Sequence, residues 1–367
     1  MRRPAHPIAA RPRPPANVEL LDSADAIRED WDALADRSGV APFLRPGWIE
    51  PWMTAFCKGE PKYLVTRRDG RLAGVLPLEA RGGTLVSAAN WHTPLYGPVV
   101  EDDAAAAELA EGLLAHAGRR ADLWFLDPEA AGYPEIASAA EGAGYGLIAR
   151  TIARSPYIAV EGSFEDFMAG LDRKFRKDIG RRWRRLEEQG GAEAAFEDGS
   201  EGLEDLLTDG FRLEGSGWKS EQGSAIASSP ERERFYREVA RWAAARGWLR
   251  LAFLRVEGRS IAFDFGIEVD GVFYIPKGGF DVEHRKLGPG QLLTHAGIER
   301  AFELGLRSYE LLGQQDEYKR QWTATTRERL RCQAFPRRPA GTTTYLAWRY
   351  GRPLVRRIRK TGKADPF

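Results

Sequence analysis

The chain has 367 residues, with 54 lysines and arginines against 53 aspartates and glutamates, so its net charge is close to zero. This length exceeds the usual size of one hydrophobic core and predicts two domains. Two cysteines exclude a disulfide framework and a Cys-x-x-Cys ligand pair, and no apolar run approaches the roughly 20 residues of a membrane helix, which favours a reduced, cytoplasmic setting.

The first half of the sequence predicts alternating strands and helices after a tail at 1–16, where proline and arginine indicate disorder. The expected elements are a strand at 17–21, a helix at 24–39, a hairpin at 62–80 that turns at Asp69-Gly70, a helix at 104–118, a buried strand at 121–127 and a helix at 135–146.

The second half repeats this order. The expected elements are a strand at 192–198, helices near 201–214 and 229–246, three strands within 248–279 that turn at Glu257-Gly258 and Asp270-Gly271, a helix at 291–305 and a strand at 307–313. The pattern therefore predicts two mixed α/β halves, 17–160 and 161–335, followed by a basic tail at 336–367.

A strongly basic segment, "KFRKDIGRRWRRLEEQGG", joins the halves. From Arg173 to Arg185 it holds eight basic residues and one acid, Asp178. Apolar residues recur at helical spacing and predict one helix over 164–189 that packs across the junction of the halves. Its basic face is either solvated or binds an anion. We predict an anionic acceptor, bound through Lys177 and Arg181 at a cleft between the halves.

A glycine-containing loop, "RKLGPGQLLTHAG", lies between an expected strand and an expected helix. Its pattern is Arg285-x-x-Gly288-x-Gly290. Glycine lets a backbone approach a ligand closely, and the first amides of a helix favour an anion. A pyrophosphate fits this pattern, although a structural strand-to-helix turn would look the same. The segment is neither a Walker loop nor a dinucleotide fingerprint.

This loop resembles the acyl-CoA pyrophosphate loop of the GNAT acyltransferase superfamily. The basic segment, "FRLEGSGWKSEQGSAI" (211–226) and "LLGQQDEYKRQW" (311–322) resemble the CelD/BcsL-like branch, which is related to the FemABX peptidyltransferases. The resemblance covers about residues 160–335. It implies an α/β fold of tandem GNAT-like domains, each a mixed twisted sheet flanked by helices.

The resemblance also implies an N-acyltransferase that uses acetyl-CoA or another acyl-CoA as co-substrate. An amine of a small molecule, sugar or peptide would attack the thioester directly, without a metal or a covalent intermediate. Tyr318, which follows the last expected strand, would protonate the departing thiolate, although it could also simply anchor a helix. The implied CoA-binding residues are Arg285, Leu287, Gly288, Gly290, Gln291 and Lys319.

Further candidates belong to the acceptor side. Glu214 would act as base or orient the amine, and Asp264 is a second candidate because a carboxylate that interrupts an apolar strand needs a partner or a raised pKa. The remaining candidate substrate-binding residues are Trp218, Lys219, Asp281 and His284. Ordinary structural roles stay open for each.

Two other functions remain open. One is a FemABX-like ligase with an aminoacyl-tRNA donor, in which the basic helix and tail would meet RNA or an anionic membrane surface. The other is a non-catalytic partner in polysaccharide synthesis. Nothing in the sequence indicates DNA binding, and the sequence does not identify the acceptor.

Overall fold

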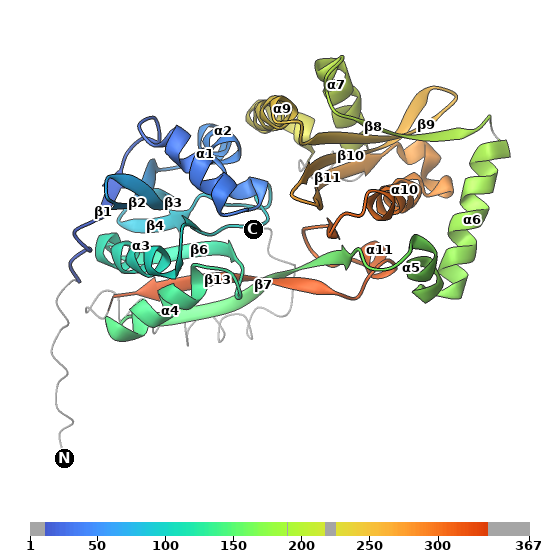
Figure 1. The fold of residues 1–367 in the computed structure, drawn as a ribbon. Coiled ribbons are helices and arrows are strands. Elements are labelled where there is room, and N and C mark those ends of the chain that lie inside the picture. Colours follow the sequence, from blue (N-terminus) through green and yellow to red (C-terminus); the bar gives the residue numbers. More distant parts are fainter. Residues whose placement is uncertain (1–11, 189, 217–224, 337–367) are drawn as a thin grey trace, which may run out of the picture.

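The computed structural model describes residues 12–188, 190–216 and 225–336 (Figure 1). The elements of its first half are β1 (Val18–Leu21), α1 (Arg28–Arg37), η1 (Pro42–Leu44), α2 (Pro46–Phe56), β2 (Glu60–Arg68), β3 (Arg71–Arg81), β4 (Thr84–Ser87), β5 (Val99–Val100), α3 (Asp103–His116), β6 (Arg120–Leu126), α4 (Tyr133–Gly142) and β7 (Gly146–Ala159).

The second half begins with two helices and then repeats the layout of the first. Its elements are α5 (Phe164–Gly170), α6 (Arg173–Glu188), β8 (Ala192–Glu197), α7 (Leu203–Glu214), η2 (Ile226–Ser228), α9 (Pro230–Ala245), β9 (Leu249–Val256), β10 (Arg259–Val269), β11 (Val272–Phe280), η3 (Val282–Leu287), α10 (Pro289–Glu303), β12 (Ser308–Glu310), α11 (Glu317–Arg320) and β13 (Thr326–Phe335). The expected mixed α/β fold with two similar halves is confirmed.

Three hairpin turns follow directly from Asp-Gly and Glu-Gly pairs. Both turn residues have positive φ at Asp69-Gly70, Glu257-Gly258 and Asp270-Gly271. This is the backbone of a two-residue turn that matches the twist of the flanking strands, and glycine adopts it without a steric penalty. All three predicted turns are therefore confirmed.

The strands form one continuous sheet across both halves, in the order β1-β2-β3-β4-β6-β13-β7-β12-β11-β10-β9-β8. The two halves mirror each other in this order. Each contains one parallel pair at the corresponding position, β4 with β6 and β11 with β12. The long strand β7 and the last strand β13 lie at the centre, where the halves meet.

The halves exchange their last strands. β13 follows the second half in the sequence but pairs with β6 of the first half, while β7 ends the first half and pairs with β12 of the second. β7 and β13 also pair with each other along ten residues. A buried ion pair joins β13 to β6. The Nε and Nη2 atoms of Arg331 donate to the two carboxylate oxygens of Asp122, each at 2.7 Å. Neither β7 nor β13 was expected from the sequence.

Aromatic side chains fill the junction between α2 and α9. Trp48 packs edge-on against Phe235 with ring centroids 5.4 Å apart, and Phe43 packs against Tyr274 at the same separation. Gly47 has no room for a side chain, since an added Cβ would lie 2.1 Å from the Trp242 ring. Close packing of this kind fixes the two halves relative to one another.

The predicted single helix over 164–189 is wrong in two respects. The chain leaves the helical conformation at Leu171, and Asp172 begins a new helix by accepting a hydrogen bond from the Phe175 amide at 2.9 Å. Moreover, α6 does not lie between the halves. Its buried residues Phe175, Ile179 and Leu186 join the core of the second half, and α6 stands at the far end of the molecule (Figure 1).

Among the residues that the structure describes, no helix is both long and apolar enough to span a membrane.

Candidate active site

The expected pyrophosphate loop lies at the beginning of α10. Gly288 has φ +65° and ψ +48°, a left-handed conformation that favours glycine, and Pro289 then starts the helix. Arg285 and Lys286 are exposed just before it, and the first turn of α10 carries no acid. The helix dipole and both cations therefore make this end of α10 attractive to an anion.

The arginine side chain of a neighbouring helix covers the loop. A Cβ added at Gly288 would lie 1.5 Å from Nη1 of Arg182, which extends from α6 and forms a salt bridge with Asp178 at 2.7 Å. Two features therefore require glycine at position 288: the left-handed backbone conformation and the close approach of the Arg182 guanidinium group.

Gln291 connects the first turn of α10 to the short helix α11. Its Nε2 donates to Gln321 Oε1 at 2.8 Å, and its Oε1 accepts from the indole N–H of Trp322. These bonds fix α11, and with it Tyr318, beside the beginning of α10. Leu287, the last residue of η3, is half-buried and belongs to the apolar side chains that pack on the core of the second half.

Strands β11 and β12 part beside this loop. They pair only from Val272 to Tyr274, after which β12 ends and β11 continues to Phe280. A bulge accompanies the separation, since Ile275 and Pro276 together face the single residue Gly266 on β10. A bulge bends its strand, and Pro276 has no amide to donate, so β11 turns away from β12 here.

The two candidate carboxylates lie on opposite faces of this sheet. Asp264 is the cross-strand partner of Gly278, and its Oδ1 lies 2.0 Å from where a Cβ of Gly278 would stand, so Asp264 occupies that face. At the next residue, Gly279, an added Cβ would project from the other face of the sheet and lie 2.4 Å from the Cα of Glu214 in α7.

Tyr318 shares a face with Asp264. Its hydroxyl is desolvated although the residue is 43% exposed, and this desolvation, followed by the charges of Asp264 and Asp316, raises the pKa of Tyr318 well above its usual value. Tyr309, fully buried beside α10, likewise has a raised pKa because of burial and then Asp264. A phenol with a raised pKa keeps its proton at neutral pH, but it is also a weaker acid, so the case for Tyr318 as proton donor depends on its position beside the beginning of α10 and not on the pKa shift.

Glu214 is fully buried on the face of α7 and α9. Its Oε2 accepts a hydrogen bond from the Ile226 amide at 2.7 Å, and its Oε1 lies 4.0 Å from Nζ of Lys277. The carboxylate thus holds the chain where α7 leads towards η2, and it has a lysine as counter-charge. Trp218 and Lys219, the other candidates on this side, lie outside the described residues.

Sequence reasoning missed a histidine from the first half at the same place. His92 Nδ1 lies 3.0 Å from the Tyr236 hydroxyl in α9, and burial, followed by the charges of Lys277 and Arg232, lowers the pKa of His92 to about 2. His92 is therefore neutral at physiological pH. No local signal marks it, because Tyr236, Lys277 and Arg232, which act on its imidazole, follow 140 or more residues later in the chain.

Three other candidates have structural partners. Asp281 caps η3 by accepting from the Glu283 amide at 3.0 Å, with His284 and Arg259 beside its carboxylate. Although burial acts against it, these contacts hold the pKa of Asp281 below its usual value. Lys319 donates to the carbonyls of the loop after β12, Leu312 at 2.8 Å and Gln314 at 3.3 Å.

The corresponding position in the first half has the opposite charge. There α3 begins with Asp102, which caps the helix by accepting from the Ala105 amide, and Asp103 follows in the first turn. Tyr96 is buried beside the parallel pair of that half, with its amide bonded to Phe125 and its hydroxyl to Pro77. An anion is disfavoured at this helix end.

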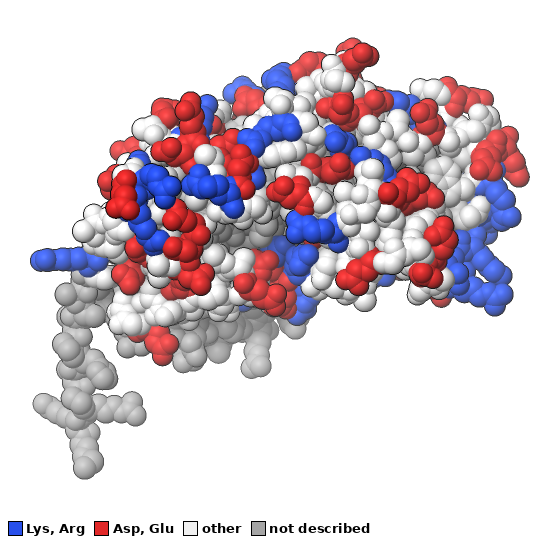
Figure 2. All heavy atoms as spheres, viewed as in Figure 1, with Lys and Arg blue, Asp and Glu red and all other residues white. Residues whose placement is uncertain are grey.

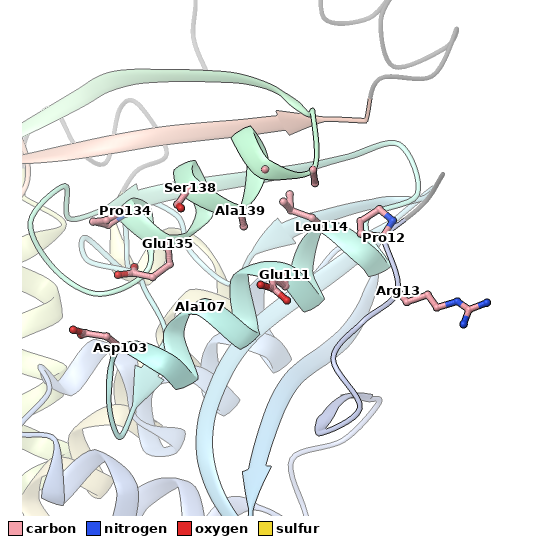
Figure 3. A pocket seen from close by; sticks show the side chains of 12 residues that line it. Pro12, Arg13, Asp103, Ala107, Glu111, Leu114, Pro134, Glu135, Ser138 and Ala139 are labelled. Atoms are coloured by element: carbon pink, nitrogen blue, oxygen red, sulfur yellow. The ribbon is translucent and has the colours of Figure 1, made fainter. Parts of the chain in front are cut away.

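A pocket between α3 and α4 lies in the same half (Figure 3). The acids Asp103, Glu111 and Glu135 surround it, and Arg13, the one cation among its described lining residues, points away. Its charge therefore does not suit a phosphorylated ligand. Within the described residues, no cluster of histidine, cysteine and acidic side chains could hold a metal ion.

Part of the chain matches a family model. Residues 173–320 match the family described as acetyltransferase (GNAT) domain. A search of curated protein sequences found no match.

Solved structures share the fold over most of the chain at low sequence identity. One is the C-terminal domain of a putative lysylphosphatidylglycerol synthetase from Agrobacterium fabrum, with a TM-score of 0.55 and 13% sequence identity over 90% of this chain and 97% of that chain. Another is L-PGS from Bacillus licheniformis, with a TM-score of 0.53 and 14% identity over 90% of this chain and 97% of that chain. FemX is a third, with a TM-score of 0.56 and 10% identity over 86% of this chain and 96% of that chain.

Proposed function

We propose that this chain, an acyltransferase whose residues 173–320 form a GNAT acetyltransferase domain, moves an acyl group from an acyl-CoA to an amine. One observation carries the proposal: β11 and β12 part directly beside the beginning of α10. If the diphosphate of the donor is bound at Gly288 and Gly290, the acyl end of this long, narrow molecule would extend towards the place where the two strands part.

In this proposal the two substrates approach from different faces of the sheet and meet where β11 and β12 part. The donor would come from the α10 face, where Tyr318 and Asp264 lie, and the amine from the α7 face, where Glu214 and Lys277 lie. Holding two reactants in attack geometry lowers the entropic part of the barrier. Asp264 would help to keep Tyr318 protonated, and Glu214 would orient the amine.

The reaction needs no further reagent. The amine nitrogen attacks the thioester carbonyl, a carbon–nitrogen bond forms, and the carbon–sulfur bond breaks. The thiolate receives the Tyr318 proton, the amine releases its proton to a base or to water, and Tyr318 regains a proton from water, so that the net products are the amide and the thiol. Lys319, tied to loop carbonyls, would support the backbone beside the donor and would not bind phosphate itself.

A second candidate donor is an aminoacyl-tRNA. The likeness of the fold to FemX and the basic face of α6 favour it, since FemABX-like enzymes transfer from such a donor. The attack of an amine on an ester would be the same. The compact glycine loop and the nearly neutral chain favour the smaller donor.

Thermal unfolding with each ligand separates the two donors. A ligand that binds only the native state at about 100 times its Kd stabilises it by about 2.7 kcal/mol. We expect acetyl-CoA to raise the Tm and uncharged tRNA to leave it unchanged. A rise with tRNA alone would refute the acyl-CoA donor.

A Gly290→Val variant tests the loop. A Cβ at this position would meet only the Phe280 ring at 3.4 Å, so the variant should fold. The branched side chain would stand in the first turn of α10 and weaken CoA binding by about ten- to a hundredfold, the worth of one or two charge-assisted hydrogen bonds.

Isothermal titration calorimetry measures this change, and the unaltered chain should bind one CoA because the first half has an acidic helix end. Gly142→Val is the matched control, since nothing lies within 4 Å of a Cβ there. Unchanged CoA affinity in a folded Gly290→Val protein would exclude this loop.

A further inference from the structure

The outer face of α6 is a concentrated positive surface. It appears as a continuous patch of basic side chains at the far end of the molecule, whereas elsewhere in this view acids and bases are mixed (Figure 2). A groove runs along this face, lined by Asp172, Arg173, Lys174, Phe175, Lys177, Asp178, Gly180, Arg181, Arg184 and Gln321.

The acids of the groove do not neutralise its cations. Asp178 is shared by Arg181 and Arg182, and Asp172 caps the helix. Within the described part of the chain, no salt bridge involves Arg173, Lys174, Lys177 or Arg184. A surface with this excess of cations attracts an anion more strongly than a mixed surface does.

The groove adjoins the donor loop at two points. Arg182, on the flank of the same helix, covers Gly288. Gln321, which lines the groove, is hydrogen-bonded to Gln291 in the first turn of α10. A ligand whose diphosphate is bound at α10 would therefore reach the groove with a second phosphate group.

We infer that the α6 groove binds a phosphomonoester at the nucleotide end of the donor, and that Lys174, Lys177 and Arg181 hold it. This inference rests on the proposed acyl-CoA donor. CoA carries such a group, the 3′-phosphate of its adenosine, in addition to its diphosphate. A phosphomonoester has a charge of about −1.5 to −2 at pH 7, which suits several cations at once.

The role proposed for Lys177 and Arg181 thereby changes. They were predicted to bind an anionic acceptor, but α6 packs on the second half, away from the junction of the halves. Because both residues lie beside α10, the anion that they would bind is a phosphate of the donor and not the acceptor.

The test compares CoA with 3′-dephospho-CoA by isothermal titration calorimetry on the full chain. The unaltered protein should bind CoA about tenfold more tightly, a modest factor because exposed charges are screened by water and salt. In the variant Lys174→Gln/Lys177→Gln/Arg181→Gln the ratio should fall to about one, while the affinity for 3′-dephospho-CoA stays the same. Raising the salt concentration should reduce the ratio only in the unaltered protein.

A second triple variant controls for net charge. Arg37→Gln/Arg71→Gln/Arg154→Gln removes three exposed cations from the first half and its last strand, and it should keep the tenfold ratio. Equal binding of both nucleotides by the unaltered protein would overturn the inference. Binding of neither would instead refute the acyl-CoA donor. Uncharged tRNA binding that disappears in the α6 variant would overturn the inference in favour of an RNA backbone.

Discussion

Replacement of Tyr318 by phenylalanine is expected to lower kcat by about 10²- to 10⁴-fold, the usual contribution of a general acid or base. The hydroxyl is the only group that the change removes, so the Kd for acyl-CoA should stay the same. The effect is large because a thiolate that leaves without a proton donor must develop its full charge in a poorly solvated site. Steady-state kinetics together with calorimetric CoA binding measure both quantities.

The pKa of Tyr318 sets the sign of the pH dependence. Desolvation and the neighbouring carboxylates raise this pKa above the ordinary value of 10, so the phenol stays protonated through neutral and moderately alkaline pH. The unaltered enzyme should not lose activity up to about pH 9 through this group. Loss begins only as the pH approaches the raised pKa and the proton is gone.

A matched control is Tyr133→Phe, which removes a hydroxyl from α4 in the first half and should leave kcat unchanged. If Tyr318→Phe turns over at the rate of the unaltered enzyme, the thiolate departs without its help. In that case Tyr318 only anchors α11 against α10.

Local chemistry made several parts of the fold predictable. The turns at Asp69-Gly70 and Asp270-Gly271 depend on residues that tolerate positive φ, and these residues are visible in the sequence itself. The beginning of α10 was predictable for the same reason, because Gly288 and Pro289 mark a turn and a helix start. Each of these features needs only a few neighbouring residues.

The exchanged strands were not predictable in this way. β13 reads "TRERLRCQAF", in which arginines alternate with apolar residues, a pattern typical of a half-buried strand. Arg329 and Arg331 are nevertheless buried, and the carboxylate that neutralises Arg331 is 209 residues earlier in the sequence. Only folding brings the two together, so the pairing of Arg331 with Asp122 could not be predicted from the charge pattern of β13.

The candidate site shows the same limit. Glu214 and Asp264 were both predicted as candidate carboxylates, and the sequence contains no sign that they lie on opposite faces of one sheet. The separation depends on the bulge at Ile275 and Pro276 and on the close approach of α7 to Gly279. His92 reaches the same region from the first half, and only the packing of α2 against α9 accounts for this.

Replacement of Asp122 by alanine is expected to lower the free energy of unfolding by about 3–5 kcal/mol, the cost of breaking a buried ion pair by removing one partner. Asp122 is 3% exposed and Arg331 is 8% exposed. The carboxylate also accepts from Gln333 at 2.9 Å, so the change leaves two buried polar side chains of β13 without this acceptor. Urea unfolding measures the loss.

Two further variants show whether the ion pair or the packing of the strand exchange is responsible. Glu328→Ala, also in β13, breaks an exposed ion pair with Arg154 of β7 and should cost at most about 1 kcal/mol. Asp122→Leu/Arg331→Met replaces both charges with apolar groups, and much of the lost stability should return because no buried charge stays uncompensated. If Asp122→Ala costs no more than Glu328→Ala, the pair does not hold β13 in the sheet of the first half. A large cost would instead mean that the two halves share one stabilising contact across their exchanged strands, so that neither half keeps its full stability without the other.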